Sequence, residues 1–267
     1  MCYSAMVEQD IRVLETKFGA AAVRKSWEDF HHARQVEENM VPPLSGRIFP
    51  GYYAPVVAIE NGQRAVRLMK YSVDPPEFVS DGKRFTTYNA RRDNITSPFW
   101  GECFGRNHGL ILLKSFYEWV AVKDLVRAGR VSLDQIKSEF EKQKAERKMR
   151  LKEAGKPYKP TKAELTEATF RKVVIGFNAM GGHDLLVPVV FSRKSSHTGE
   201  VRYGFAVVTD DPPLEVEAAG HDRCPVFLDS EAAGRWLKPE DAQDDFELSQ
   251  LLKSRPSLVF EHSLAVA

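Results

Sequence analysis

The sequence predicts an α+β protein, because short apolar runs separated by turn signals share the chain with segments that have helical spacing. The strongest strand signal is a pair of apolar runs, residues 56–59 and 65–69, joined by Asn61-Gly62, which is typical of a tight hairpin turn. Further runs of strand length cover residues 110–113, 173–177, 186–191 and 205–208. We therefore expect one domain over residues 1–267, with a core made mainly of short strands.

Two shorter segments are expected to form helices beside these strands. Residues 10–18 have the apolar spacing of an amphipathic helix, and Gly19 is placed to end it. Asp229 has the character of an N-cap for a helix that runs to Leu237.

Residues 121–170 differ in kind, and we interpret them as a basic helical insertion between strands. Ser132 and Gln135 fit a capping box for a helix over 133–154, whose apolar face stops at Phe140. Residues 121–172 contain 15 Lys and Arg against 8 Asp and Glu, whereas the whole chain has a net charge of +1. Such asymmetry is typical of a surface that binds a polyanion, and equally of a solvated helical face.

The composition indicates an ordinary globular protein, with 43% hydrophobic and 28% charged residues. No run of 18 apolar residues and no apolar leader is present, so we expect a cytoplasmic protein without a membrane partner. Cys2, Cys103 and Cys224 are too few for a disulfide framework and lack metal-ligand spacing. We expect no metal and no cofactor, free thiols, and a monomer.

Cys2 is the first candidate for chemistry because of its position. A small residue in second place permits removal of Met1, which would make Cys2 the N-terminal residue. Its α-amine and its thiol would then titrate at about 8 and about 8.5. The amine condenses with an aldehyde to an imine, and the thiol closes on the imine carbon to give a five-membered thiazolidine.

Three other segments combine groups that suit catalysis or anion binding. Asn89-Ala90-Arg91-Arg92 sets an amide beside two guanidinium groups. Glu118 follows the apolar run 110–113 among aromatic residues, so we expect it near a strand end, where partial desolvation favours proton transfer. His221 follows Gly220 in an expected loop, and its imidazole ordinarily titrates near neutral pH.

Together these segments resemble the SOS-response-associated peptidase (SRAP) family, whose four motifs are matched in order by Cys2, Asn89-Ala90-Arg91, Phe116-Tyr117-Glu118-Trp119 and His221-Asp222-Arg223-Cys224-Pro225. The resemblance covers roughly residues 1–120 and 171–262. It implies a β-barrel-like, antiparallel core and covalent capture of abasic sites in single-stranded DNA. Tyr3-Ser4 replace the Gly-Arg that usually follows the cysteine, and the insertion is longer than usual, which indicates a divergent member.

With this resemblance we assign each candidate residue an expected role. Cys2 supplies both nucleophiles, Glu118 and His221 transfer protons, and Asn89 positions the amine or the sugar oxygen. Arg91 is expected to contact phosphate, with Arg92 and Arg223 behind it. Aromatic rings are expected to stack on bases flanking the lesion, and these are Tyr3, Tyr117 and Trp119. The expected partner is single-stranded DNA with an abasic site, and the protein would be nucleoid-associated when bound.

Two other functions fit parts of the sequence. An N-terminal-nucleophile amidotransferase or peptidase also begins with a processed cysteine, and glutamine hydrolysis would identify it. A nucleic-acid-binding module that works through the basic insertion would bind with strong salt dependence and leave no covalent product.

Overall fold

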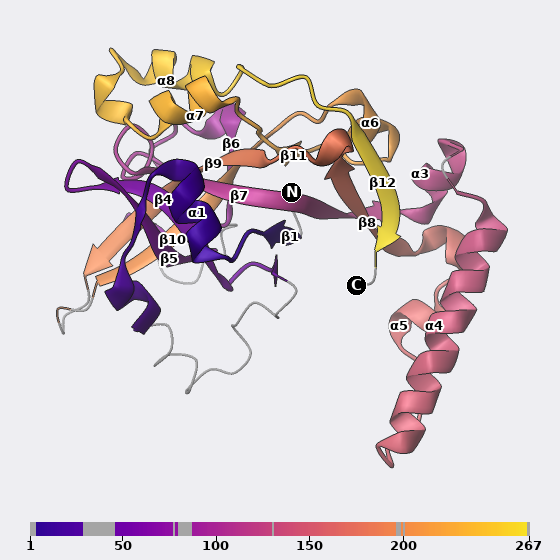
Figure 1. Ribbon diagram of the computed structural model, residues 1–267. Helices are drawn as coiled ribbons and strands as arrows, with labels where there is room; N and C mark the ends of the chain where they lie inside the picture. The colour runs from indigo at the N-terminus through magenta and orange to yellow at the C-terminus, as the bar shows by residue number, and fades with distance from the viewer. Residues whose placement is uncertain are drawn as a thin grey trace.

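The computed structural model describes residues 4–28, 46–76, 78–79, 87–129, 131–195, 199 and 201–265, and its fold is α+β, as the sequence predicts (Figure 1). The strands are β1 (Ser4–Val7), β2 (Ala21–Ala22), β3 (Arg47–Ile48), β4 (Tyr53–Glu60), β5 (Gln63–Lys70), β6 (Asn89–Arg91), β7 (His108–Ala121), β8 (Lys172–Ala179), β9 (Leu185–Ser195), β10 (Val201–Asp210), β11 (Cys224–Pro225) and β12 (Phe260–Ala265). The α-helices are α1 (Ile11–Phe18), α3 (Val122–Arg127), α4 (Leu133–Glu153), α5 (Lys162–Leu165), α6 (Leu214–Ala218), α7 (Ser230–Trp236) and α8 (Asp245–Leu251). Short 3-10 turns are η2 (Arg92–Asn94), η3 (Ala168–Phe170), η4 (Met180–Gly182) and η5 (Pro239–Asp241).

Five of the described strands close into a barrel. The pairs β5–β4, β4–β7, β7–β9 and β9–β10 are antiparallel, and the parallel contact of β10 with β5 completes the ring. That closure depends on Gly204, which pairs with Lys70, because a Cβ at position 204 would lie 2.1 Å from the carbonyl oxygen of Ser72. The expected barrel-like core is therefore confirmed.

The strands divide their apolar side chains between two buried clusters. On β7, Ile111 and Leu113 belong to one cluster, and the alternate residues Leu110 and Leu112 belong to the other. The second cluster includes residues of α1, α7 and α8, so it lies between the outer face of the barrel and those helices. The first, which we call the inner cluster, fills the barrel and continues under β8 and β12.

Several local predictions are confirmed. Asn61-Gly62 forms the β4–β5 turn, with both residues at positive φ. Gly19 ends α1 in the left-handed conformation, and the side chain of Asp229 accepts a hydrogen bond that caps α7. Among the described residues, no helix has both the length and the apolar character to cross a membrane.

The insertion connects two neighbouring strands. Ala121 at the end of β7 pairs with Lys172 at the start of β8, so the chain leaves and re-enters the sheet at one place. Ser132 and Gln135 form the predicted capping box of α4, and Ile136 is buried in the inner cluster at its base. Beyond Phe140 the helix projects away from the barrel (Figure 1).

Candidate active site

Glu118 lies inside β7, because this strand continues to Ala121 and does not end with the apolar run 110–113. Phe116 and Val120, which flank Glu118 on the same face, both belong to the inner cluster. The carboxylic side chain is only 1% exposed. Strand alternation thus turns Glu118 into the core.

Tyr117 and Trp119 point to the opposite face of β7 and are half-buried. The guanidinium carbon of Arg47 lies 4.2 Å from the centre of the Tyr117 ring, a cation–π contact. Two of the three aromatic residues expected to stack on bases therefore lie on the face of β7 opposite to Glu118.

His221 reaches Glu118 from the loop that follows α6. Gly220 in this loop has φ +87°, and a Cβ there would lie 2.9 Å from Cβ of Asp124 and 3.0 Å from Cγ1 of Val120. Only glycine allows the backbone to approach β7 so closely with this φ. The glycine before the histidine, which the sequence offered only as a loop signal, thus brings the imidazole to the strand that carries Glu118.

The two side chains form a close pair, with Nε2 of His221 at 3.1 Å from Oε2 of Glu118. The other ring nitrogen, Nδ1, lies 2.6 Å from the carbonyl oxygen of Arg223, which can only accept a hydrogen bond. The backbone N–H of Arg223 lies further from Nδ1, at 3.3 Å, and that contact would require Nδ1 to accept. We assign the proton to Nδ1 from the shorter contact.

With the proton on Nδ1, Nε2 of His221 faces Oε2 of Glu118, and a hydrogen bond between these two atoms requires one shared proton. The pair is then either a neutral imidazole with a carboxylic acid or an imidazolium with a carboxylate. Because the His221 side chain is 11% exposed, the pair borders solvent on the imidazole side. Such a pair can act as a general acid toward one atom of a substrate and as a general base toward another. Because the proton is shared, neither step requires an isolated charge in the core.

Asn89 is buried on β6, which lies parallel to β10. The hydroxyl group of Tyr71 donates a hydrogen bond to Oδ1 of Asn89 at 3.3 Å and fixes the orientation of the amide. Tyr71 belongs to the same inner cluster as the residues that flank Glu118. The site residues Asn89, Glu118 and His221 thus come from three segments distant in sequence. The contacts described here join Glu118 to His221, and Asn89 to Tyr71.

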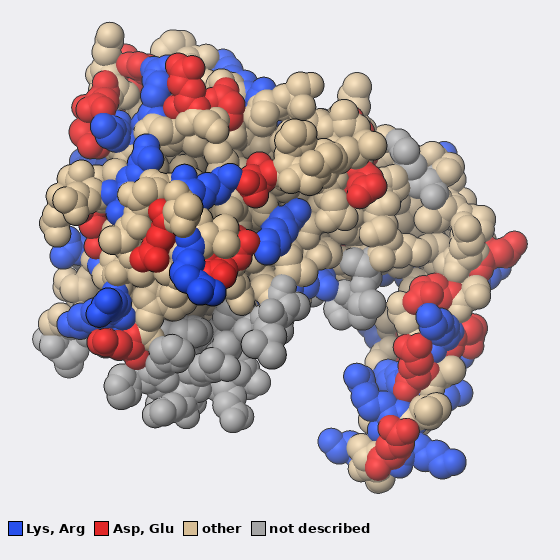
Figure 2. Space-filling view, in the orientation of Figure 1, with Lys and Arg blue, Asp and Glu red and all other residues tan. Residues whose placement is uncertain are grey.

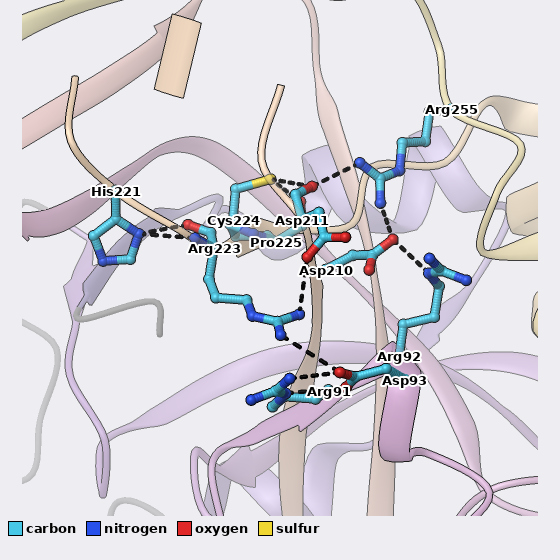
Figure 3. A network of polar contacts seen from close by, with 10 residues as sticks. All are labelled: Arg91, Arg92, Asp93, Asp210, Asp211, His221, Arg223, Cys224, Pro225 and Arg255. Carbon is cyan, nitrogen blue, oxygen red and sulfur yellow. Dashed lines mark hydrogen bonds and ion pairs between the residues drawn. The ribbon is translucent and has the colours of Figure 1, made fainter. Parts of the chain in front are cut away.

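An arginine–aspartate network lies next to the His221 loop (Figure 3). Arg91 donates two hydrogen bonds to Asp93, which hold the pKa of that carboxyl group below its usual value. Arg223 lies 3.5 Å from the same carboxylate and 3.4 Å from Asp211. Because the side chain of Arg91 is 52% exposed and that of Arg223 is 14% exposed, Arg91 is the more accessible cation of the two.

Arg92 has a different environment. Its side chain and that of Arg255 both form ion pairs with Asp210, whose side chain is 3% exposed. Arg255 also donates a hydrogen bond to the carbonyl oxygen of Asp211 at 2.9 Å. We infer that Arg92 holds the end of β10 in place, since its guanidinium group compensates a buried carboxylate.

Cys2 and Tyr3 lie outside the described residues. The first residue of β1, Ser4, pairs with Tyr117, the residue before Glu118. Ser4 is fully buried and accepts a hydrogen bond from Nε of Arg47 at 3.1 Å. The described chain therefore begins on β1, directly beside the strand that carries Glu118.

The two described cysteines are buried thiols. Burial raises the pKa of Cys103 to about 12 and that of Cys224 to about 12. A thiol with so high a pKa forms little thiolate at neutral pH, so neither Cys103 nor Cys224 is suited to be a nucleophile. In the described part of the chain, no three His, Cys, Asp or Glu side chains gather in a way that could hold a metal ion.

Sequence reasoning missed the residues that support this site from a distance. Two of them contact candidate residues of the strands: Arg47 packs on Tyr117, and Tyr71 donates a hydrogen bond to Asn89. The other two are Asp210, which pairs with Arg92, and Arg255, which pairs with Asp210. They occur outside the recognised motifs, and no spacing signal links them to those motifs.

Fold and site together define a closed barrel protein with a buried carboxyl–imidazole pair and an arginine-rich network beside it. The family described as SOS response associated peptidase (SRAP) matches residues 1–161, more than half of the chain, and the chain therefore belongs to this family. Membership supports a DNA-associated role, with DNA as a partner, at the level of the family. No curated protein matches the chain.

Three solved structures share the fold. A protein from Bordetella bronchiseptica is 14% identical with a TM-score of 0.62 and covers 100% of both chains. A protein from Bacteroides thetaiotaomicron is 12% identical with a TM-score of 0.61, covering 98% of this chain and 91% of its own. A phage-related protein from Bordetella bronchiseptica is 18% identical with a TM-score of 0.52, covering 83% and 81%. At such identities the likeness extends to the fold alone.

Proposed function

We propose that this protein captures abasic sites in single-stranded DNA covalently, through the α-amine and thiol of Cys2 after removal of Met1. The observation that carries the proposal is the Glu118–His221 pair, with 3.1 Å between Nε2 and Oε2. Imine formation requires an acid that protonates the former aldehyde oxygen, so that it leaves as water, and a base that takes protons from the amine. A carboxyl–imidazole pair can fill both roles.

Chain connectivity supports a role for Cys2 at this pair. Cys2 precedes Ser4 by two residues in the chain. Ser4 is in register with Tyr117, the neighbour of Glu118. The residue two positions after Cys2 is thus held on β1, which pairs with the strand that carries the proposed acid.

The proposed reaction begins with the open-chain form of the abasic sugar, whose C1′ is an aldehyde carbon. The α-amine adds to this carbon, and the Glu118–His221 pair protonates the hydroxyl group so that water leaves and an imine forms. The Cys2 sulfur then adds to the imine carbon, and its proton passes to the nitrogen. One C–N and one C–S bond form, one water is released, and nothing is oxidised or reduced.

The arginine network suits the backbone of the same strand. Arg91 is half-exposed at the end of β6, beside the His221 loop, and a guanidinium group binds phosphate through two parallel hydrogen bonds. Its present partner, Asp93, would have to yield part of that contact. Arg223, held between Asp93 and Asp211, would contribute mainly positive potential.

Denaturing electrophoresis of the purified chain after incubation with an abasic single strand tests the proposal. We expect a slower band that survives heat and detergent for the wild type and for Cys224→Ala, the matched control in which a buried thiol is removed. Cys2→Ala and a chain with an additional N-terminal residue should give no such band, because an amide nitrogen is not nucleophilic. An adduct of normal yield with either of these two variants would contradict the proposal.

The amidotransferase or peptidase alternative is tested with the same proteins. It requires the Cys2 thiol to attack an amide carbonyl, so the wild type would hydrolyse glutamine or a peptide and leave abasic DNA unmodified.

A further inference from the structure

The helical arm, residues 131–170, carries its positive charge at the end far from the barrel. Residues 142–162 contain nine Lys and Arg against two Asp and Glu, whereas residues 133–141 contain one Lys against three acidic residues. Figure 2 shows basic side chains spread around the far end of the arm, away from the body. The surplus of positive charge is therefore concentrated at the solvent-exposed far end of the arm and is not spread evenly along α4.

The arm is attached firmly at its base. Ile136 is 1% exposed in the inner cluster, with Leu133 and Phe140 packed against that cluster. The guanidinium carbon of Arg171 lies 4.3 Å from the centre of the Phe140 ring, which ties the base of α4 to the start of β8. The direction in which the arm leaves the barrel is thus fixed by packing.

The far end is also an ordered structure. Arg147 of α4 contacts both carboxylate oxygens of Glu164, at 3.1 and 2.9 Å, and donates to the carbonyl oxygen of Lys159 at 3.1 Å. The ring of Tyr158 lies 4.9 Å from the ammonium group of Lys148. These contacts hold the segment after Gly155 along the helix, so cations from both parts of the arm lie together.

This arrangement has an electrostatic cost in the isolated chain. Lys144, Lys148 and Lys152 are spaced four residues apart, so they lie one above another on α4, and like charges at this spacing destabilise a helix. Lys144 is relieved by Glu141 at 3.3 Å. Lys148 and Lys152 are exposed, and a bound polyanion would relieve them.

We propose that the arm binds the phosphate backbone of the DNA strand on which the candidate active site acts, a proposal that rests on the proposed function. The 12 residues from 142 to 153 span about 18 Å at 1.5 Å per residue, enough for several successive phosphates. A single helix with cations on more than one side can contact phosphates but has no groove or pocket for bases, so we expect it to bind DNA without regard to base sequence. The arm would then add affinity for intact and damaged strands alike.

The test measures the salt dependence of binding to an intact, fluorescein-labelled single strand of 20 nucleotides, which has no aldehyde and forms no adduct. The arm variant carries Lys148→Gln, Lys152→Gln and Lys156→Gln, since Gln keeps length and helix propensity. The matched control carries Lys25→Gln, Lys238→Gln and Lys253→Gln, three exposed cations on the body that leave the same net charge. Circular dichroism checks that all three proteins keep the same helix content.

Each lost phosphate contact lowers the slope of log affinity against log salt by about 0.7 on a single strand. If all three cations contact phosphate, the slope falls by about 2, and affinity at 0.1 M salt falls by about 100-fold. We expect a loss of this order for the arm variant, and a body control that stays close to wild type.

Equal slopes for the wild type and the arm variant would overturn the proposal and leave an acidic protein surface as the better partner for the arm. Equal losses in the arm variant and the body control would also overturn it, because only net charge would then matter. The outcome also distinguishes this proposal from the proposed function. A wild type whose salt slope depends on the arm, but which forms no adduct with abasic DNA, would contradict the covalent chemistry and leave the role of the arm intact.

Discussion

Gly220→Ala is a sharp perturbation of the candidate site, because it changes neither member of the Glu118–His221 pair. The new methyl group would lie 2.9 Å from Cβ of Asp124 and 3.0 Å from Cγ1 of Val120. Alanine in the left-handed region costs about 1–2 kcal/mol, and overpacking adds about 1–3 kcal/mol if the surroundings hold still. If the loop moves instead, the imidazole withdraws from β7.

Gly62→Ala provides the matched control for backbone strain. Gly62 has φ +76° in the β4–β5 turn, and a Cβ there meets nothing within 4 Å. This variant should lose only about 1–2 kcal/mol of stability and keep its site. The difference between the two variants therefore isolates the contact with β7.

The assay combines urea unfolding with single-turnover formation of the adduct with abasic DNA. We expect Gly220→Ala either to lose at least about 1 kcal/mol more than Gly62→Ala, or to form the adduct at least about tenfold more slowly, because proton transfer contributes about 10²–10⁴-fold to such reactions. A Gly220→Ala protein that matched Gly62→Ala in both stability and rate would refute the view that this glycine sets the position of His221.

Three further predictions follow from the described contacts. Glu118→Gln and His221→Gln should each slow adduct formation by about 10²–10⁴-fold, and the double variant should be little slower than either, as expected of two groups that share one proton; single-turnover rates that multiplied in the double variant would contradict the shared-proton view. Iodoacetamide at pH 7.5 should alkylate one thiol of the native chain rapidly, because burial raises the pKa of Cys103 and of Cys224 to about 12. The reaction is followed by mass spectrometry, and three thiols that reacted at similar rates would contradict this prediction. Asp229→Ala should cost about 1 kcal/mol at pH 7 through loss of the α7 cap. The backbone hydrogen bond from Ala232 lowers the pKa of Asp229, so the charge-dependent part of this contribution is present above the unfolded value of 3.8 and is lost as the pH falls through the lowered folded value; a difference between the two proteins in urea unfolding that was as large at pH 2 as at pH 7 would contradict the assignment.

Local structure was predictable wherever a few neighbouring residues determine it. The Asn61-Gly62 turn, the caps at Ser132 and Asp229 and the end of α1 at Gly19 depend on hydrogen bonds or φ values within a few residues. Barrel closure was different, since it depends on one parallel contact between Gly204 and Lys70, which no local pattern reveals. The sequence motifs alone therefore implied the barrel only through family resemblance.

The candidate site was predictable in its residue types and less so in its geometry. Glu118 was expected near a strand end, and it lies three residues before Ala121, the last residue of β7. Its nearly complete burial was not expected, because it depends on which face of β7 turns into the core. Arg92 was expected behind Arg91 as a DNA contact, yet its side chain pairs with Asp210, which is 118 residues away in the chain. Partners at such separation are brought together by the tertiary structure, which no local sequence pattern reveals.

The central claim is that both nucleophiles of Cys2 are consumed in one product, and alkylation of the purified adduct tests it most directly. The adduct is unfolded in denaturant, treated with excess iodoacetamide, digested and weighed. We predict a protein without Met1, joined to the DNA with loss of one water, in which Cys103 and Cys224 are alkylated and Cys2 is not, because its sulfur is bonded to the former aldehyde carbon. Alkylation of all three thiols would show an open imine, and an adduct that retains Met1 or maps to another residue would contradict the account.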